Sequence, residues 1–144
     1  MSELFYSSGI LSYHKSEKSG GLKLILEVDQ GIANYYRKLI PKTYPKINPQ
    51  MYAAHISVVR HENPNLEFWG KYEGELVEFV YSNIIKNGEI YFWLDCYSLR
   101  LEEIRKELGL PFEPLHPSHE FYKFVPEPYS RTFHCTLGNL KTQN

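Results

Sequence analysis

Apolar side chains recur at every second position in several stretches of the chain, which is the spacing of a β-strand with one buried face. In residues 22–28, Leu22, Leu24 and Leu26 fall on one face and Lys23 on the other. The strands expected on this basis span residues 4–14, 22–28, 51–60, 75–82, 89–97 and 132–138.

Two further segments repeat their apolar residues every three or four positions, as an amphipathic helix does. The first follows Asp29, a residue suited to cap a helix, and stops at Pro41. The second begins after Ser98, another capping residue, and ends at Gly109. The element order is therefore β-β-α-β-β-β-α-β, which indicates a single α+β domain over residues 1–144 with predominantly antiparallel strands.

Proline-rich segments interrupt this pattern in two places. Residues 41–50 contain Pro41, Pro45 and Pro49, and they are expected to form a loop. Residues 111–131 contain five prolines, so this long segment is expected to be irregular and to act as a flap over a site.

Two of the predicted strands carry the same short pattern, a histidine followed two positions later by a hydroxyl residue. These pairs are His55 with Ser57, and His134 with Thr136. Because residues two apart in a strand share a face, each strand presents an imidazole and a hydroxyl together while its other residues face the core. A single pair of this kind arises often by chance, and a lone strand histidine is more often structural. Two pairs in two strands favour a catalytic interpretation.

Histidine and hydroxyl side chains suit the cleavage of a phosphodiester by a neighbouring ribose hydroxyl. That reaction needs a base for the attacking oxygen and an acid for the leaving oxygen, and histidine serves both roles near neutral pH. Ser57 and Thr136 would donate hydrogen bonds to the non-bridging phosphate oxygens. The pattern does not decide whether His55 or His134 is the base.

The two pairs, with Gly138-Asn139 directly after the second, resemble the two-histidine phosphoesterase superfamily, which includes the 2′-5′ RNA ligase-like proteins. The resemblance implies a bilobal α+β fold in which antiparallel sheets line a central cleft and the helices lie outside. It also implies metal-independent chemistry at phosphodiesters that adjoin a 2′-hydroxyl. Within the superfamily, the small size and the run from Trp69 to Arg105 look most like phage anti-CBASS nucleases. These are implied to cleave the 3′-5′ linkages of cyclic di- and trinucleotide immune signals.

Aromatic residues make up 15% of the chain, more than a core of this size usually needs. In the strand 89–97, Tyr91 and Trp93 fall between carboxylates on one face, so they are candidates for stacking on nucleobases. The alternative is that they pack under the 111–131 flap. The anti-CBASS resemblance implies that an N-terminal tyrosine and a tryptophan flank the bases; Tyr13 and Trp93 match, with Trp69 as the second choice for the tryptophan.

The charge balance limits the partners that this chain is expected to have. Its 16 Lys and Arg against 17 Asp and Glu give a net charge of −1, which argues against a long nucleic acid and favours a ligand with few phosphates. No cofactor is expected. His116 and His119, with Glu120 next to the latter, lie in a proline-rich loop without a further convergent ligand, so no metal site is expected there. The oligomeric state is left open between a monomer and a weak homo-oligomer.

Other features indicate a cytoplasmic protein, in the host cell if the chain is phage-encoded. No apolar run is long enough to span a membrane, and the first residues lack a signal-peptide pattern. Cys96 and Cys135 are therefore expected to be reduced thiols.

Two alternatives to a cyclic-oligonucleotide phosphodiesterase stay open at this point. One is RNA-end processing, either the opening of 2′,3′-cyclic phosphates or the joining of RNA ends. The other is a binding protein that sequesters a nucleotide signal without cutting it, and the presence of both His-x-Ser/Thr pairs argues against it.

Overall fold

The computed structural model describes residues 3–15, 21–40, 47–49, 53–111 and 125–141. Its elements match the predicted order closely, so the sequence pattern is confirmed at the level of individual strands and helices. They are β1 (Leu4–Lys15), β2 (Leu22–Glu27), α1 (Gln30–Lys38), β3 (His55–Val59), a short 3-10 helix (Leu66–Phe68), β4 (Leu76–Asn87), β5 (Tyr91–Tyr97), α2 (Leu99–Glu107) and β6 (Phe133–Asn139).

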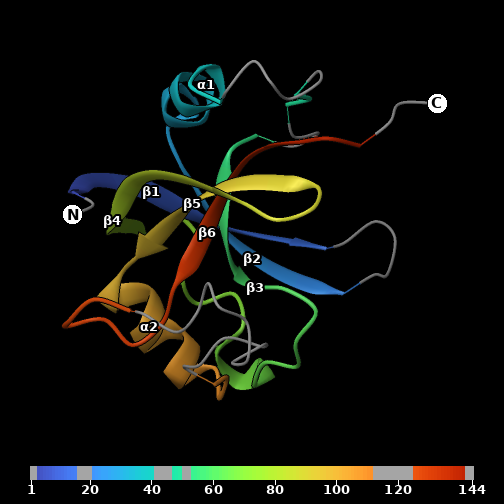
Figure 1. The fold of residues 1–144 in the computed structure, drawn as a ribbon. Helices are drawn as coiled ribbons and strands as arrows, with labels where there is room; N and C mark the ends of the chain where they lie inside the picture. Colours follow the sequence, from blue (N-terminus) through green and yellow to red (C-terminus); the bar gives the residue numbers. More distant parts are fainter. Residues whose placement is uncertain (1–2, 16–20, 41–46, 50–52, 112–124, 142–144) are drawn as a thin grey trace.

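The strands join in the order β1-β2-β3-β6-β5-β4, and every neighbouring pair is antiparallel. The sheet closes because β4 also pairs with β1, from Leu4 opposite Ser82 to Ile10 opposite Leu76. The result is a closed barrel (Figure 1). The predicted bilobal fold, with separate sheets around a central cleft and helices outside, is therefore wrong. Pairing of β1 with β4 turns what would be two sheet edges into one continuous ladder.

The two helices lie on opposite sides of the strands, α1 above them and α2 below them in the view of Figure 1. Each begins at the predicted cap, since Asp29 accepts a hydrogen bond from the Gly31 amide and Ser98 accepts one from the Leu101 amide. Helix α2 ends as predicted before Gly109, whose φ of 74° is a conformation that glycine adopts without steric cost.

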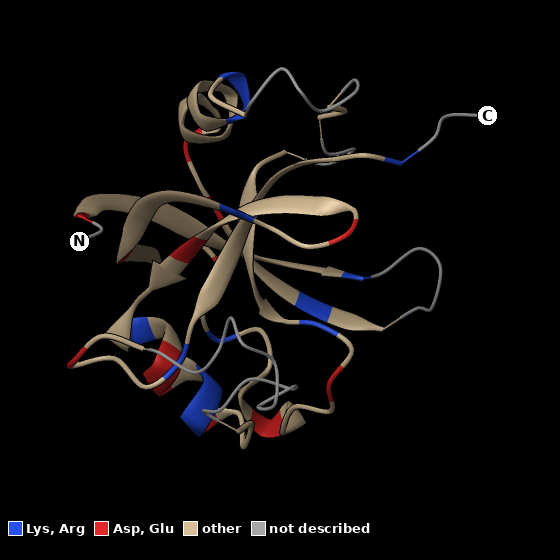
Figure 2. Cartoon of the chain, viewed as in Figure 1, with Lys and Arg blue, Asp and Glu red and all other residues tan. Residues whose placement is uncertain are grey.

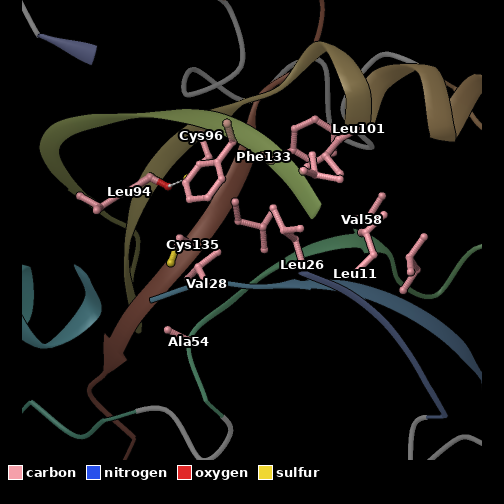
Figure 3. Packing of buried hydrophobic residues seen from close by; sticks show 14 of the residues in the cluster. Leu11, Leu26, Val28, Ala54, Val58, Leu94, Cys96, Leu101, Phe133 and Cys135 are labelled. Carbon is pink, nitrogen blue, oxygen red and sulfur yellow. Dashed lines mark hydrogen bonds between the residues drawn. The ribbon is translucent and has the colours of Figure 1, made fainter. Parts of the chain in front are cut away.

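Residues from the barrel and from both helices contribute to one hydrophobic core. Figure 3 shows Leu26 and Val58 from two strands, and Leu101 of α2, among the side chains of this core. Cys96 and Cys135 are also buried in this core, and both are free thiols. Burial raises the pKa of the Cys135 thiol to about 12, so it is a packing residue and a poor nucleophile.

The predicted flap falls mostly outside the described residues, which resume at residue 125. In the described part, the Ser130 amide donates to both carboxylate oxygens of Glu102, and Tyr129 stacks on Tyr97 at a centroid distance of 5.4 Å. This part of the segment therefore packs against α2 and β5.

No helix in the described part of the chain combines the length and the apolar character needed to cross a membrane.

Candidate active site

The two His-x-Ser/Thr pairs lie side by side on neighbouring antiparallel strands. β3 and β6 are paired at Ile56 and Cys135, and both of these side chains are buried in the core. Because successive side chains of a strand alternate between faces, the residues flanking this pair point away from the core. The residues so presented are His55, Ser57, His134 and Thr136, all of them partly exposed. We call these four residues the two-histidine patch.

The register fixes the arrangement within the patch. With Ile56 opposite Cys135, His55 lies opposite Thr136 and Ser57 lies opposite His134. The two histidines are thus diagonal neighbours, a relation that places residues roughly 7–8 Å apart in an antiparallel sheet, with their Cβ atoms somewhat closer. Each imidazole also has a hydroxyl beside it on its own strand and one across the ladder. The patch therefore brings two acid-base groups and two hydrogen-bond donors together on a rigid support, although not across a cleft between lobes as expected.

His55 is held in a defined tautomer. Its Nδ1 lies 2.8 Å from the carbonyl oxygen of Ala53, and because a carbonyl only accepts, Nδ1 carries the proton. The neutral ring then has its lone pair on Nε2, which makes Nε2 the basic nitrogen.

The surroundings of His55 disfavour its charged form. Burial lowers the pKa of His55 most, and the positive charges of Lys23, Arg60 and His14 lower it further, against an opposing effect of the Ala53 hydrogen bond. The lowered pKa favours the uncharged form of His55, which is the form that can act as a base.

His134 has different neighbours. Its ring lies 5.0 Å from the indole of Trp93, centroid to centroid, at an interplanar angle of 31°. Its Nε2 lies 3.6 Å from Oδ1 of Asp95, whose side chain is 2% exposed. A carboxylate at this distance stabilises an imidazolium, so this position suits a histidine that carries a proton.

Cations border the patch on the side of β2. Lys23 on β2 and Arg60 after the end of β3 both act electrostatically on His55, and the burial and positive neighbour of Lys23 lower its own pKa. Blue segments on β2 and at the adjacent end of β3 mark this region in Figure 2. Lys23 was not identified from the sequence, because its neighbours across the sheet depend on the strand order. The sequence offered one indication of Lys23: the alternation of residues 22–28 places this residue on the solvent face of the strand.

The aromatic candidates are not gathered at one place. Trp93 is only 8% exposed; it packs against His134 and, near the hairpin turn, lies beside Gly88. Tyr91 is exposed and lies under the ammonium group of Lys141 at 5.1 Å.

Tyr13 and the second-choice tryptophan lie together elsewhere. Tyr13 is paired with the core residue Leu24, and its ring meets Trp69 edge-on at a centroid distance of 4.6 Å. The Tyr13 hydroxyl also accepts a hydrogen bond from the Tyr72 amide. The ring next to Tyr13 is therefore that of Trp69, whereas Trp93 lies next to His134. That any of these aromatic residues binds nucleobases stays a prediction.

The dipeptide after the second pair, Gly138-Asn139, allows another segment of the chain to pair closely with β6. The Asn139 amide and carbonyl exchange hydrogen bonds of 2.9 Å with the backbone of Asn48. A Cβ atom at Gly138 would lie 2.7 Å from the Asn48 carbonyl oxygen, which is too close. Glycine therefore allows residues 47–49 to pair along β6 next to the patch.

Within the described ranges, no three His, Cys, Asp or Glu side chains converge as a metal site would require. His116, His119 and Glu120 lie outside those ranges.

No protein-family model, curated protein or solved structure matches this chain. The resemblance to the two-histidine phosphoesterase superfamily therefore stays a prediction that rests on the residues of the patch.

Proposed function

We propose that the chain is a metal-independent phosphodiesterase that cleaves 3′-5′ linkages of cyclic di- and trinucleotides, as the resemblance to anti-CBASS nucleases implies. The observation that carries this proposal is the two-histidine patch, in which adjacent strands present two imidazoles with two hydroxyls. The cations beside His55 add support, because a phosphodiester is an anion.

The contrasting surroundings of the two histidines support one distribution of roles in the proposed reaction. Nε2 of His55 takes the proton from the ribose 2′-hydroxyl, and the 2′-oxygen then bonds to the adjacent phosphorus. The bond from phosphorus to the 5′-oxygen breaks, and His134 donates a proton to that leaving oxygen. Ser57 and Thr136 donate hydrogen bonds to the non-bridging oxygens as negative charge develops there. The products are a 2′,3′-cyclic phosphate end and a 5′-hydroxyl end.

A panel of cyclic di- and trinucleotides, incubated with the protein in the presence of EDTA, tests this proposal. We expect at least one ring to be opened to a linear product ending in a 2′,3′-cyclic phosphate, detected by chromatography and mass spectrometry after heat denaturation. The matched all-deoxy ring should stay intact, because it lacks the attacking hydroxyl. Equal cleavage of the deoxy ring, or a requirement for a divalent cation, would contradict the mechanism.

The same incubation separates the two alternatives. A binding protein that only sequesters the nucleotide releases intact ligand after denaturation. An RNA-end-processing enzyme acts on RNA carrying a 2′,3′-cyclic phosphate and shows a steep dependence on salt, because it contacts many phosphates.

The lowered pKa of His55 predicts where activity fails in acid. A general base must be neutral, so kcat/KM should fall as the pH drops through the pKa of His55, at a pH below the ordinary imidazole value of about 6.5. Removing a neighbouring cation with Lys23→Met should move this acidic limb to higher pH. Lys71→Met, which alters an exposed lysine paired with Glu107, is the matched control and should leave the limb in place. An acidic limb unmoved by Lys23→Met would contradict the electrostatic coupling.

A further inference from the structure

Asp95 is a buried carboxylate that the proposed reaction does not itself use. It lies on β5 opposite His134 of β6, and its side chain is 2% exposed. Oδ1 accepts a hydrogen bond of 3.1 Å from the indole nitrogen of Trp93 and lies 3.6 Å from Nε2 of His134. Oδ2 pairs with the ammonium group of Lys86 on β4. Three strands thus converge on one carboxylate beside the patch.

A buried ionised carboxylate is stable only if its charge is balanced and its oxygens are hydrogen-bonded. Lys86 supplies the balancing charge, and Trp93 supplies a hydrogen bond to the oxygen that faces His134. Among the described residues, the charged and titratable groups gathered at this point are Asp95, Cys96 and Tyr97 on β5, Lys86 on β4 and His134 on β6. Asp95 is the anionic member of that set.

We propose that Asp95 is a positioning residue that orients His134 and stabilises its protonated form, that Trp93 holds Asp95 in place, and that Lys86 balances part of its charge. The proposal rests on the proposed function, since the benefit is to keep His134 ready to donate its proton. It also gives Trp93 a different task from base stacking. Its ring lies against the imidazole while its N–H fixes the carboxylate, so one side chain restrains both partners.

Lys86 and Asp95 have opposite effects on His134 under this proposal. Without the anion, the imidazolium loses its stabilising partner. Without the cation, the anion is less compensated and stabilises the imidazolium more. A purely structural role of the network has no such sign reversal, because either substitution would disturb the packing in the same direction.

The test compares Asp95→Asn and Lys86→Met with the native protein by two measurements. The first is an NMR titration of the His134 ring resonances without substrate. The midpoint should move to lower pH by about one unit in Asp95→Asn, the low end of the effect of a nearby opposite charge, and to higher pH in Lys86→Met. The second is the basic limb of the activity profile, which should move in the same directions. Glu107→Gln, a carboxylate on α2, is the control and should change neither.

The two measurements separate failure of this proposal from failure of the proposed function. Opposite shifts of the His134 midpoint in the two variants support the positioning role even if no cyclic nucleotide is cleaved. A midpoint that is unchanged in Asp95→Asn, or that moves the same way in both variants, overturns it even if the native protein is an active phosphodiesterase. Because Asn keeps an acceptor oxygen for the Trp93 indole, Asp95→Asn retains the shape of the network.

Discussion

His55→Ala and His134→Ala should each lower turnover of a cyclic dinucleotide by about 10²–10⁴-fold, the usual contribution of a positioned acid or base. His55→Ala removes the nitrogen that takes the proton from the attacking hydroxyl. His134→Ala removes the donor to the leaving oxygen. Because the two groups act on one transition state, the double variant should be little worse than the more damaged single one. Single-turnover kinetics on the native protein and the three variants measures these losses.

The control for this experiment is another histidine, which follows the end of β3. His61 is exposed and has a φ of 54°, a conformation that asparagine tolerates, so His61→Asn should keep native turnover. Thermal unfolding should show that both alanine variants remain folded, since His55 and His134 lie outside the core. Native turnover in His134→Ala would contradict the assignment of the patch as a catalytic centre.

The strands and helices could be predicted from the sequence because their signals are local. Alternation of apolar residues marked β2, and Asp29 and Ser98 marked the starts of both helices. Closure of the barrel could not be predicted in this way, because it depends on the pairing of β4 with β1, two strands far apart in the sequence. Alternation within a strand says which of its faces is buried and not which strand it pairs with. The bilobal arrangement came from the family resemblance, and the long β1–β4 ladder excludes it.

The same limit applies to the candidate site. Within each strand, the shared face of His55 and Ser57 follows from a period of two, and so does that of His134 and Thr136. Their placement side by side follows from the pairing of Ile56 with Cys135, which no local pattern reveals. The burial of Asp95, with its contacts to Lys86 and the Trp93 indole, likewise depends on how β4, β5 and β6 pair.

The strand that carries His55 and Ser57 is tied to α2 by one buried arginine. Arg105 of α2 is fully buried, and its Nη1 donates to the Val58 carbonyl, next to Ser57, at 2.7 Å. Both terminal nitrogens also pair with Glu62, at 2.8 and 2.7 Å, and Nη2 and Nε donate to the Pro111 carbonyl. Burial alone would raise the pKa of Glu62, but the hydrogen bonds and charge of Arg105 outweigh it and hold that pKa below its ordinary value.

Arg105→Met should therefore destabilise the protein by about 3–5 kcal/mol, the cost of removing one partner of a buried ion pair. The substitution leaves the Glu62 carboxylate without its cation, and the carbonyl oxygens of Val58 and Pro111 without their donor. Methionine keeps an unbranched apolar side chain in the core, so the loss reports mainly on the polar network. Equilibrium unfolding in urea, with the midpoint and the slope both fitted, measures the change in the free energy of unfolding.

Two comparisons make this prediction specific to the buried arginine. Arg100→Met breaks ion pairs with Glu75 and Glu103 on the partly exposed side of the same helix, and it should cost about 1 kcal/mol or less. Combining Glu62→Leu with Arg105→Met should recover part of the stability, because no uncompensated charge then remains in the core. If Arg105→Met costs no more than Arg100→Met, Arg105 is not the anchor of β3. A larger loss in Arg105→Met means that the strand presenting His55 and Ser57 depends on this buried charge.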